Sequence, residues 1–306
     1  MEILDQMYKP KSYLLCFVAV ALFSTYEIVG KIFGNHIPPV TITAIRFFIG
    51  GLLLLPFALK EPKLYKNFNY SIAGKILLVG ILNVAISMVF LQLSVFYGKA
   101  VLAAIIFSAN PVFVGLFSIL LEKERLSKVN ILGLTIGLLG LVLIIISEES
   151  LFRDSGNMLL GIMFGILSGV VFALYTVLSK KYVKEIGSFK LNSFAFLSGS
   201  FILLIIAIFF NIDIAFEINR SNTLSLLYLG IIVTGIGYYL YFEGLKNLST
   251  SKGAMIFYMK PVIAGILAYI FLGETLTFMQ ILGFAIVILG INTENLLKTL
   301  SLSKNF

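Results

Sequence analysis

Long apolar runs separated by short polar segments dominate the chain. Each run is close to the roughly 20 residues that a helix needs to cross the hydrocarbon of a bilayer. The pattern predicts an all-α polytopic membrane protein with ten transmembrane helices and little chain left for a soluble domain. The predicted helices lie at about 13–33, 40–59, 75–97, 100–121, 129–147, 159–180, 191–210, 224–245, 252–272 and 278–297.

Composition supports the membrane assignment. Of the 306 residues, 59% are hydrophobic and 12% are charged, against about 45–50% and about 25% in soluble domains. The net charge of +8 is spread over short clusters between the apolar runs, which indicates contact with membrane lipid and excludes a nucleic-acid partner. The first run lacks a cleavage site of small residues, so we interpret it as a retained helix.

The distribution of Lys and Arg predicts the orientation. With the N-terminus in the cytoplasm, seventeen of the 23 basic residues fall in cytoplasmic segments and three in outside loops. This bias is the one that orients helices in membranes. It predicts a multi-pass protein of the plasma membrane with both termini in the cytoplasm.

The second half of the chain repeats the first. With an offset of 150, fourteen of the 37 positions from Ala104 to Gly140 carry the same residue type, including the pairs Pro111/Pro261 and Gly115/Gly265. Each repeat holds five predicted helices, in 1–150 and in 151–306. Because five is odd, the second repeat enters the membrane from the opposite side. Inverted repeats of this kind are typical of secondary transporters that alternate access around a midplane site.

Two segments carry a resemblance to a known family. "NPVFVGLFSILLEKERLSKVNILGLTIGLLG" and "KPVIAGILAYIFLGETLTFMQILGFAIVILG" resemble the paired signatures of EamA-type transporters of the drug/metabolite transporter superfamily. The resemblance extends over about 13–297. It implies ten helices, a central cavity lined mainly by helices 1, 3, 4, 6, 8 and 9, and export or exchange of small metabolites. The chain departs from the family in having no Trp, and the residues before the two prolines vary in the family, so Asn110 and Lys260 inherit no role from it.

Charged residues inside the predicted spans are the first candidates for a substrate site. A charge near the middle of the bilayer costs at least about 2.5–3.5 kcal/mol, so Lys260 should face a wet cavity or an opposite charge. The alternative is a structural ion pair between helices. Glu27 is the predicted partner of Lys260, although it could instead pair with Lys31. Glutamates of helix 1 couple protons in small multidrug relatives, so the resemblance also makes Glu27 the candidate proton carrier.

Further candidates are polar and aromatic. Tyr239 and Glu243 share a helix face and could bind an amine, although Glu243 could simply pair with Lys246. Neutral polar residues such as Asn83 and Asn110 often only bond one helix to another. Tyr175 is the repeat mate of Tyr26. The predicted substrate-binding residues are Lys260, Glu27, Tyr175, Asn110, Asn83, Tyr239 and Glu243.

Other features favour a structural role. Arg46 lies near the start of the second helix and is interpreted as an anchor in the lipid headgroups. Ser127 and Thr277 are predicted to cap helices, with Gln280 completing a capping box. The repeated glycines of 133–140 and 283–290 predict close backbone packing, either at a lipid-facing surface or between two copies of the chain in a homodimer.

Enzyme chemistry is not indicated. The single histidine, His36, precedes two prolines, and no metal cluster, nucleotide loop or paired intramembrane aspartates are present in the sequence, so we predict no cofactor. The sequence favours a secondary transporter of small organic metabolites such as amino acids. The alternative is a lipid-handling or structural membrane protein without solute transport.

Overall fold

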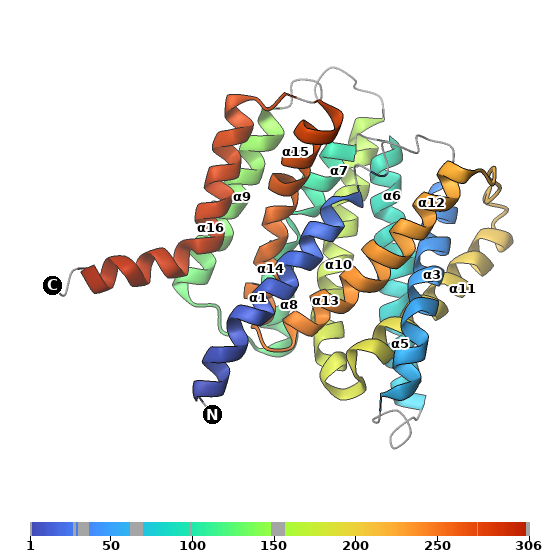
Figure 1. Ribbon diagram of the computed structural model, residues 1–306, viewed down its shortest axis with the longest axis horizontal. Coiled ribbons are helices and arrows are strands. Elements are labelled where there is room, and N and C mark those ends of the chain that lie inside the picture. The colour runs from blue at the N-terminus through green and yellow to red at the C-terminus, as the bar shows by residue number, and fades with distance from the viewer. Residues whose placement is uncertain are drawn as a thin grey trace.

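The computed structural model describes residues 2–26, 29, 37–61, 70–97, 100–147, 157–273 and 275–303, and within these ranges no residue is in a β-strand (Figure 1). Eight helical segments are long and apolar enough to cross a membrane, and Pro10–Ser24 and Phe278–Glu294 are shorter apolar helices. The prediction of an all-α, multi-pass membrane protein is therefore confirmed. The eight segments are Pro39–Lys60, Tyr70–Tyr97, Leu102–Glu122, Lys128–Ile146, Met158–Ile186, Ser188–Phe209, Arg220–Leu245 and Thr250–Phe271.

The first half of the chain contains two interrupted spans. One consists of α5, the π-helical segment η2 and α6 in continuous succession, and the other of α7 and α8 joined through a turn at Ser108 and Ala109. The helices are α1 (Glu2–Ser24), α3 (Pro39–Lys60), α5 (Tyr70–Gly80), η2 (Ile81–Ser87), α6 (Met88–Tyr97), α7 (Ala100–Phe107), α8 (Asn110–Glu122) and α9 (Lys128–Ile146).

The second half also contains two interrupted spans. A π-helical segment, η4, lies between α12 and α13, and a 3₁₀ turn, η5, lies between α14 and α15. The helices are α10 (Met158–Ile186), α11 (Ser188–Phe209), α12 (Arg220–Tyr228), η4 (Leu229–Ile236), α13 (Gly237–Leu245), α14 (Thr250–Met255), η5 (Ile256–Tyr258), α15 (Met259–Leu272) and α16 (Phe278–Ser303).

Two prolines explain where the α7–α8 and α14–α15 spans are interrupted. A proline inside a helix has no N–H to donate, and its ring clashes with the carbonyl four residues earlier. For Pro111 that residue is Phe107, the last residue of α7, and for Pro261 it is Phe257, the middle residue of η5. Both phenylalanines therefore lie at an irregular point of the backbone near the middle of a span.

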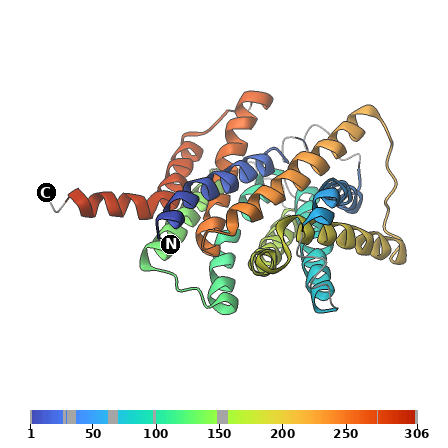
Figure 2. The same cartoon turned by 60° about the horizontal axis from the view of Figure 1, so that its bottom comes forward.

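Helices from the two halves of the sequence pack against one another. α9 lies beside α16 at one end of the molecule, and α3 lies beside α11 at the other (Figures 1 and 2). Between these pairs, α1 packs on α13 and α6 packs on α10. Serine hydroxyls hold α10 to this span, because Ser94 of α6 donates to the carbonyl of Gly161 at 2.7 Å and Ser168 of α10 donates to that of Ser87, the last residue of η2, at 2.8 Å.

The repeated glycines bring α9 and α16 into backbone contact. A Cβ added to Gly140 would lie 2.8 Å from the carbonyl oxygen of Gly283, and one added to Gly290 would lie 2.5 Å from the amide nitrogen of Gly137. Close glycine packing is confirmed, and this surface is occupied within one chain. The homodimer stays a prediction.

Both predicted caps are present at the starts of these helices. Ser127 Oγ accepts from the amide of Asn130 at 3.1 Å. Thr277 Oγ1 accepts from the amide of Gln280 at 3.1 Å, and Gln280 Oε1 accepts in return from the amide of Thr277 at 2.9 Å, which completes the capping box.

Candidate functional site

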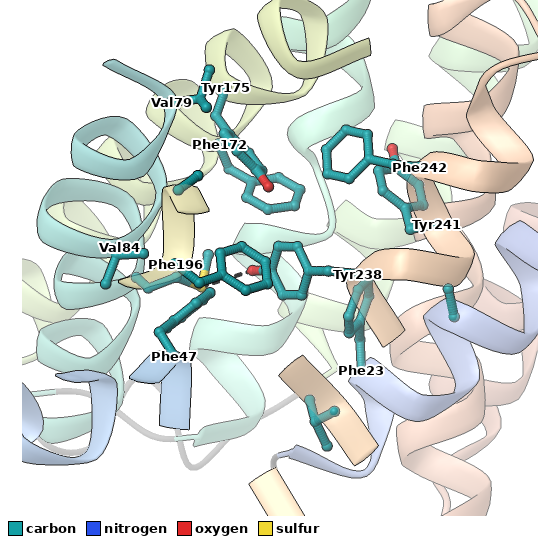
Figure 3. Close-up of a cluster of buried hydrophobic side chains, with 14 of the residues drawn as sticks. Phe23, Phe47, Val79, Val84, Phe172, Tyr175, Phe196, Tyr238, Tyr241 and Phe242 are labelled. Carbon is teal, nitrogen blue, oxygen red and sulfur yellow. Dashed lines mark hydrogen bonds between the residues drawn. The ribbon is translucent and has the colours of Figure 1, made fainter. Parts of the chain in front are cut away.

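A cluster of aromatic rings fills the middle of the helix bundle (Figure 3). Tyr238 of α13 is its central member, with edge-to-face contacts to Phe23 at 5.0 Å, Phe196 at 5.2 Å and Phe47 at 5.6 Å between ring centroids. Its hydroxyl lies 3.5 Å from Asn83 Oδ1 and 3.4 Å from Met88 Sδ. Such contacts join α1, α3, α11 and α13 around one ring.

A small cavity lies beside this cluster and receives side chains from both halves of the chain. Its volume is about 30 Å³, which is room for one or two water molecules and not for a metabolite. Substrate would therefore enter only after side chains move. The lining residues are Phe23, Tyr26, Arg46, Met88, Leu91, Phe107, Phe172, Val233, Tyr238, Phe257 and Lys260.

Lys260 is one of the two cations that line this cavity in the described part of the chain. It is 2% exposed, and its Nζ lies 5.1 Å from the centroid of the Phe107 ring. Lys260 directly precedes Pro261, so the interruption of the α14–α15 span and the cation occur together. The structure therefore places Lys260, the first substrate-site candidate from the sequence, at the cavity.

Arg46 is the second cation, and its predicted role as a headgroup anchor is wrong. Its side chain is 3% exposed and points inward from α3, with Cζ 4.7 Å from the ring centroids of both Tyr26 and Phe47. In the described part of the chain, its Nε and Nη2 make no hydrogen bond. The predicted cavity also omitted the second helix, which supplies this residue. The sequence did contain a signal for a buried cation, because Arg46 is the eighth residue of α3 and lies roughly 10 Å from the helix start.

The rings of Tyr26 and Phe47 only partly offset the cost of burying the Arg46 guanidinium. Removing an ion from water costs several kcal/mol even after the protein relaxes. A cation over an aromatic face recovers about 0.5–2 kcal/mol. The Nε and Nη2 groups of Arg46 therefore keep a tendency to bind an opposite charge or water.

Three predicted neutral residues lie close to the cavity without lining it. Tyr175 is 1% exposed, and its ring packs against Phe172 at 5.6 Å and Tyr238 at 6.4 Å. Asn83 meets the Tyr238 hydroxyl from η2. Asn110 is fully buried and donates from Nδ2 to the carbonyl of Phe107 at 2.8 Å, so it holds the interrupted turn.

The remaining predicted residues lie elsewhere or outside the described chain. Tyr239 stacks on Phe189 at 4.1 Å, on the side of α13 that faces α11. Glu243 pairs with Lys246 at 2.5 Å and accepts from Ser188 Oγ at 2.9 Å, so the predicted alternative of a local ion pair is present. Glu27 lies outside the described residues, as does Lys31.

A second, larger hollow of about 700 Å³ lies between α1, α9, α14 and α16. Its charged residues Lys252 and Glu294 pair with each other at 2.5 Å. Because their charges cancel, this hollow offers a bound ion less than the central cavity does. We therefore place the candidate site at the central cavity.

Comparison of the sequence with known protein families identifies this chain as a transporter. The model of the EamA-like transporter family matches residues 10–146 and 159–292. The chain belongs to the EamA-like transporter family and is a membrane transporter. This membership favours transport over the alternative of a lipid-handling or structural membrane protein.

Relatives with similar sequences carry the same general name. A protein named as an uncharacterized transporter in Clostridium kluyveri is 34% identical, with 92% of this chain and 91% of that protein covered. Transporter YoaV of Bacillus subtilis is 28% identical, with 91% and 94% covered. One crystal structure superposes with a TM-score of 0.78 over 94% of this chain and 98% of that one, and its 21% identity supports the fold alone.

Proposed function

We propose that the protein is a secondary transporter of small organic metabolites, built from two inverted repeats of five membrane-spanning helices, residues 1–150 and 151–306. The repeats rock against each other and expose the central cavity to each side of the plasma membrane in turn. The observation that carries this proposal is a central cavity lined from both halves of the chain and containing the buried cation Lys260.

Irregular backbone recurs at matching positions in the two halves, which supports the repeat. The π-helical segments η2 and η4 begin 148 residues apart, close to the sequence offset of 150. The left-handed residues Lys123 and Gly273, with φ of 54° and 66°, each follow the helix that contains the repeated proline. Departures from regular helix are seldom shared by chance, because each depends on particular neighbours.

Helix contacts also match when the two halves are exchanged. A Cβ on Gly50 of α3 would lie 3.0 Å from the carbonyl of Gly230 in η4, and a Cβ on Gly199 of α11 would lie 2.6 Å from that of Gly80 in α5. Gly199 and Gly80 are the repeat mates of Gly50 and Gly230. The exchange likewise converts the α1–α13 contact into the α10–α6 contact.

A polar network closes the end of the bundle that the predicted orientation assigns to the cytoplasm. Lys180 of α10 donates to Thr250 Oγ1 at 2.8 Å, and the Thr250 hydroxyl donates to Glu122 at the end of α8. Beside it, Ser251 Oγ donates to Glu124 at 2.5 Å. Opening this network is the step in our proposal that admits solute from the cytoplasm.

The proposed roles follow from these positions. Lys260 contacts the solute, and Tyr175, Asn83 and Asn110 shape the surrounding helices. Glu27 remains our candidate for proton coupling, because it follows Tyr26, which lines the cavity. Amino acids remain candidate substrates. Tyr239 and Glu243 are not among the lining residues of the cavity, and their roles as substrate-binding residues stay predictions.

Proteoliposome transport tests the proposal. The purified protein should exchange labelled metabolites from a panel across the vesicle membrane. Lys260→Met should abolish exchange and leave the yield of folded protein unchanged, while the control Lys128→Met, at an exposed lysine, should preserve both. Exchange that survives in Lys260→Met would contradict the role of the cavity. If the transport rate changes neither with an applied proton gradient nor with the Glu27→Gln substitution, the proposal that Glu27 couples transport to protons is wrong.

Thiol labelling tests the inverted repeat separately. In a Cys16→Ala background, Lys123→Cys should react with an impermeant reagent only from the cytoplasmic face, and Thr275→Cys only from the outside. Labelling of both cysteines from one face would rule out the inversion, whatever the transport result.

A further inference from the structure

The central cavity has an excess of positive charge. Eleven of the described residues line it; Arg46 and Lys260 are two of these, and none of the eleven is acidic. Glu27, next to Tyr26 in sequence, is the nearest acidic residue along the chain to any of them. Even with its carboxylate in the cavity, one positive charge would remain in excess. An anionic solute would therefore be bound more favourably than a neutral or cationic one.

One edge of the Arg46 guanidinium group can bind this anion. A guanidinium group binds a carboxylate most strongly through two parallel N–H groups. Nε and Nη2, the buried nitrogens of Arg46 that make no hydrogen bond in the described chain, form one such edge. Its flat faces are occupied, because Tyr26 and Phe47 lie against the guanidinium at 4.7 Å. The edge is therefore the part of Arg46 left for a ligand.

The other walls of the cavity select the body of the solute. Phe23, Phe107, Phe172 and Phe257 surround it, and Val233 and Leu91 add aliphatic surface. Such apolar walls cannot form the hydrogen bonds that a second strongly hydrated group of the solute would lose on leaving water. They suit an apolar or aromatic body, and they disfavour a free phosphate or an additional ammonium group.

We propose that the transported solute is a small organic anion, a carboxylate with an apolar or aromatic body. Its carboxylate binds the Nε–Nη2 edge of Arg46, Lys260 supplies the second positive charge, and its body packs between the phenylalanine rings. This inference rests on the proposed function and names the substrate class of the same site, and it narrows that class to anions, in place of zwitterionic amino acids.

Ligands matched in shape and different in charge test the proposal on the unmodified full-length protein. Phenylacetate, phenylacetamide, 2-phenylethylamine and L-phenylalanine form one set, and 3-methylbutanoate with its amide and amine forms a second. Binding to the detergent-purified protein is measured by calorimetry. In at least one set the carboxylate should bind about tenfold or more tightly than every partner, a difference of about 1.4 kcal/mol. If the carboxylate does not bind more tightly than every partner in either set, the proposal is overturned.

Substitutions of Arg46 test whether this residue causes the preference for carboxylates. Arg46→Gln should remove the difference between carboxylate and amide, and Arg46→Lys should weaken carboxylate binding while keeping part of the charge preference. Arg220→Gln is the control, because it removes an arginine from the exposed start of α12. If Arg46→Gln does not fold, Arg46→Lys and the wild-type ligand sets still decide the outcome. Unchanged selectivity in a folded Arg46 variant would overturn the assignment.

The inference and the proposed function fail in different ways. Charge-selective binding of carboxylates without exchange in vesicles would remove the transport mechanism and leave the binding site. Exchange of neutral or cationic solutes, with no preference for carboxylates, would support the transporter and remove the anion site.

Discussion

The hydroxyl of Tyr238 lies 3.5 Å from Oδ1 of Asn83, and this contact joins the two π-helical regions of the molecule. Asn83 lies within η2. Tyr238 is the second residue of α13, two positions after the end of η4. π-helical segments often occur at functional sites, because the extra residue in the turn alters the local backbone. The pair therefore connects the irregular backbone of both halves at the edge of the central cavity.

Tyr238→Phe removes the hydroxyl and keeps the ring in the aromatic cluster. One net hydrogen bond contributes about 0.5–1.5 kcal/mol, so we expect a small fall in stability on thermal unfolding in detergent. Transport should fall by a larger factor, about tenfold, if the pair coordinates the two halves. Tyr228→Phe is the control, because the Tyr228 hydroxyl bonds to Thr25 at 2.9 Å and neither residue is among those that line the cavity. Equal effects of the two changes on transport would contradict a special role for Tyr238.

Thr250→Val tests the proposed closure at the cytoplasmic end. The substitution keeps the shape of the side chain but removes the hydroxyl that lies between Lys180 and Glu122. Loosening of this end should expose Ser179, which is fully buried one residue before Lys180. With Ser179→Cys in a Cys16→Ala background, the rate of labelling by a water-soluble maleimide should rise severalfold. Thr223→Val, at an exposed threonine, is the control, and an unchanged labelling rate would argue against the closure.

Gly140→Ala tests the contact between α9 and α16. The new methyl group would lie 2.8 Å from the backbone oxygen of Gly283, which cannot move without displacing α16. We expect a loss of about 1–3 kcal/mol in stability, the usual cost of overpacking. Gly74→Ala provides the matched control, because nothing lies within 4 Å of its added Cβ, and it should leave stability unchanged or raise it by about 0.5–1 kcal/mol. Similar unfolding midpoints for the two variants would show that α9 and α16 separate easily.

Glu61→Gln tests a cap that holds α3 to α11. The Glu61 carboxylate accepts from the amides of Phe189 at 3.4 Å and Lys190 at 3.1 Å, at the positive end of α11. Losing the negative charge should cost about 1 kcal/mol, the typical value of a helix N-cap. Glu185→Gln is the control, because that carboxylate is 46% exposed in its pair with Lys75 and surface pairs contribute about 0–1 kcal/mol. A thermal shift no larger than that of the control would mean that the cap adds little.

The sequence by itself predicted the helical segments and the caps, and it contains the two prolines beside which two of the spans are interrupted. These features depend on neighbours along the chain. The length of an apolar run determines whether it can span a bilayer, Ser127 and Thr277 bond to residues three positions away, and Pro111 and Pro261 act on the preceding turn. For the same reason the sequence marked Lys260, whose depth along its helix follows from counting residues.

Only the tertiary structure decided which way each side chain points and what it meets. Counting places Arg46 at a depth from which its long side chain could reach the headgroups or turn inward, and the packing of α3 against its neighbours turns it inward over Tyr26. Tyr239 and Tyr238 are adjacent in sequence, yet one stacks on Phe189 and the other lines the cavity. The rotation of a helix about its axis is determined by its contacts with helices distant in sequence, so the depth of Arg46 could be counted from the sequence but the direction of its side chain could not.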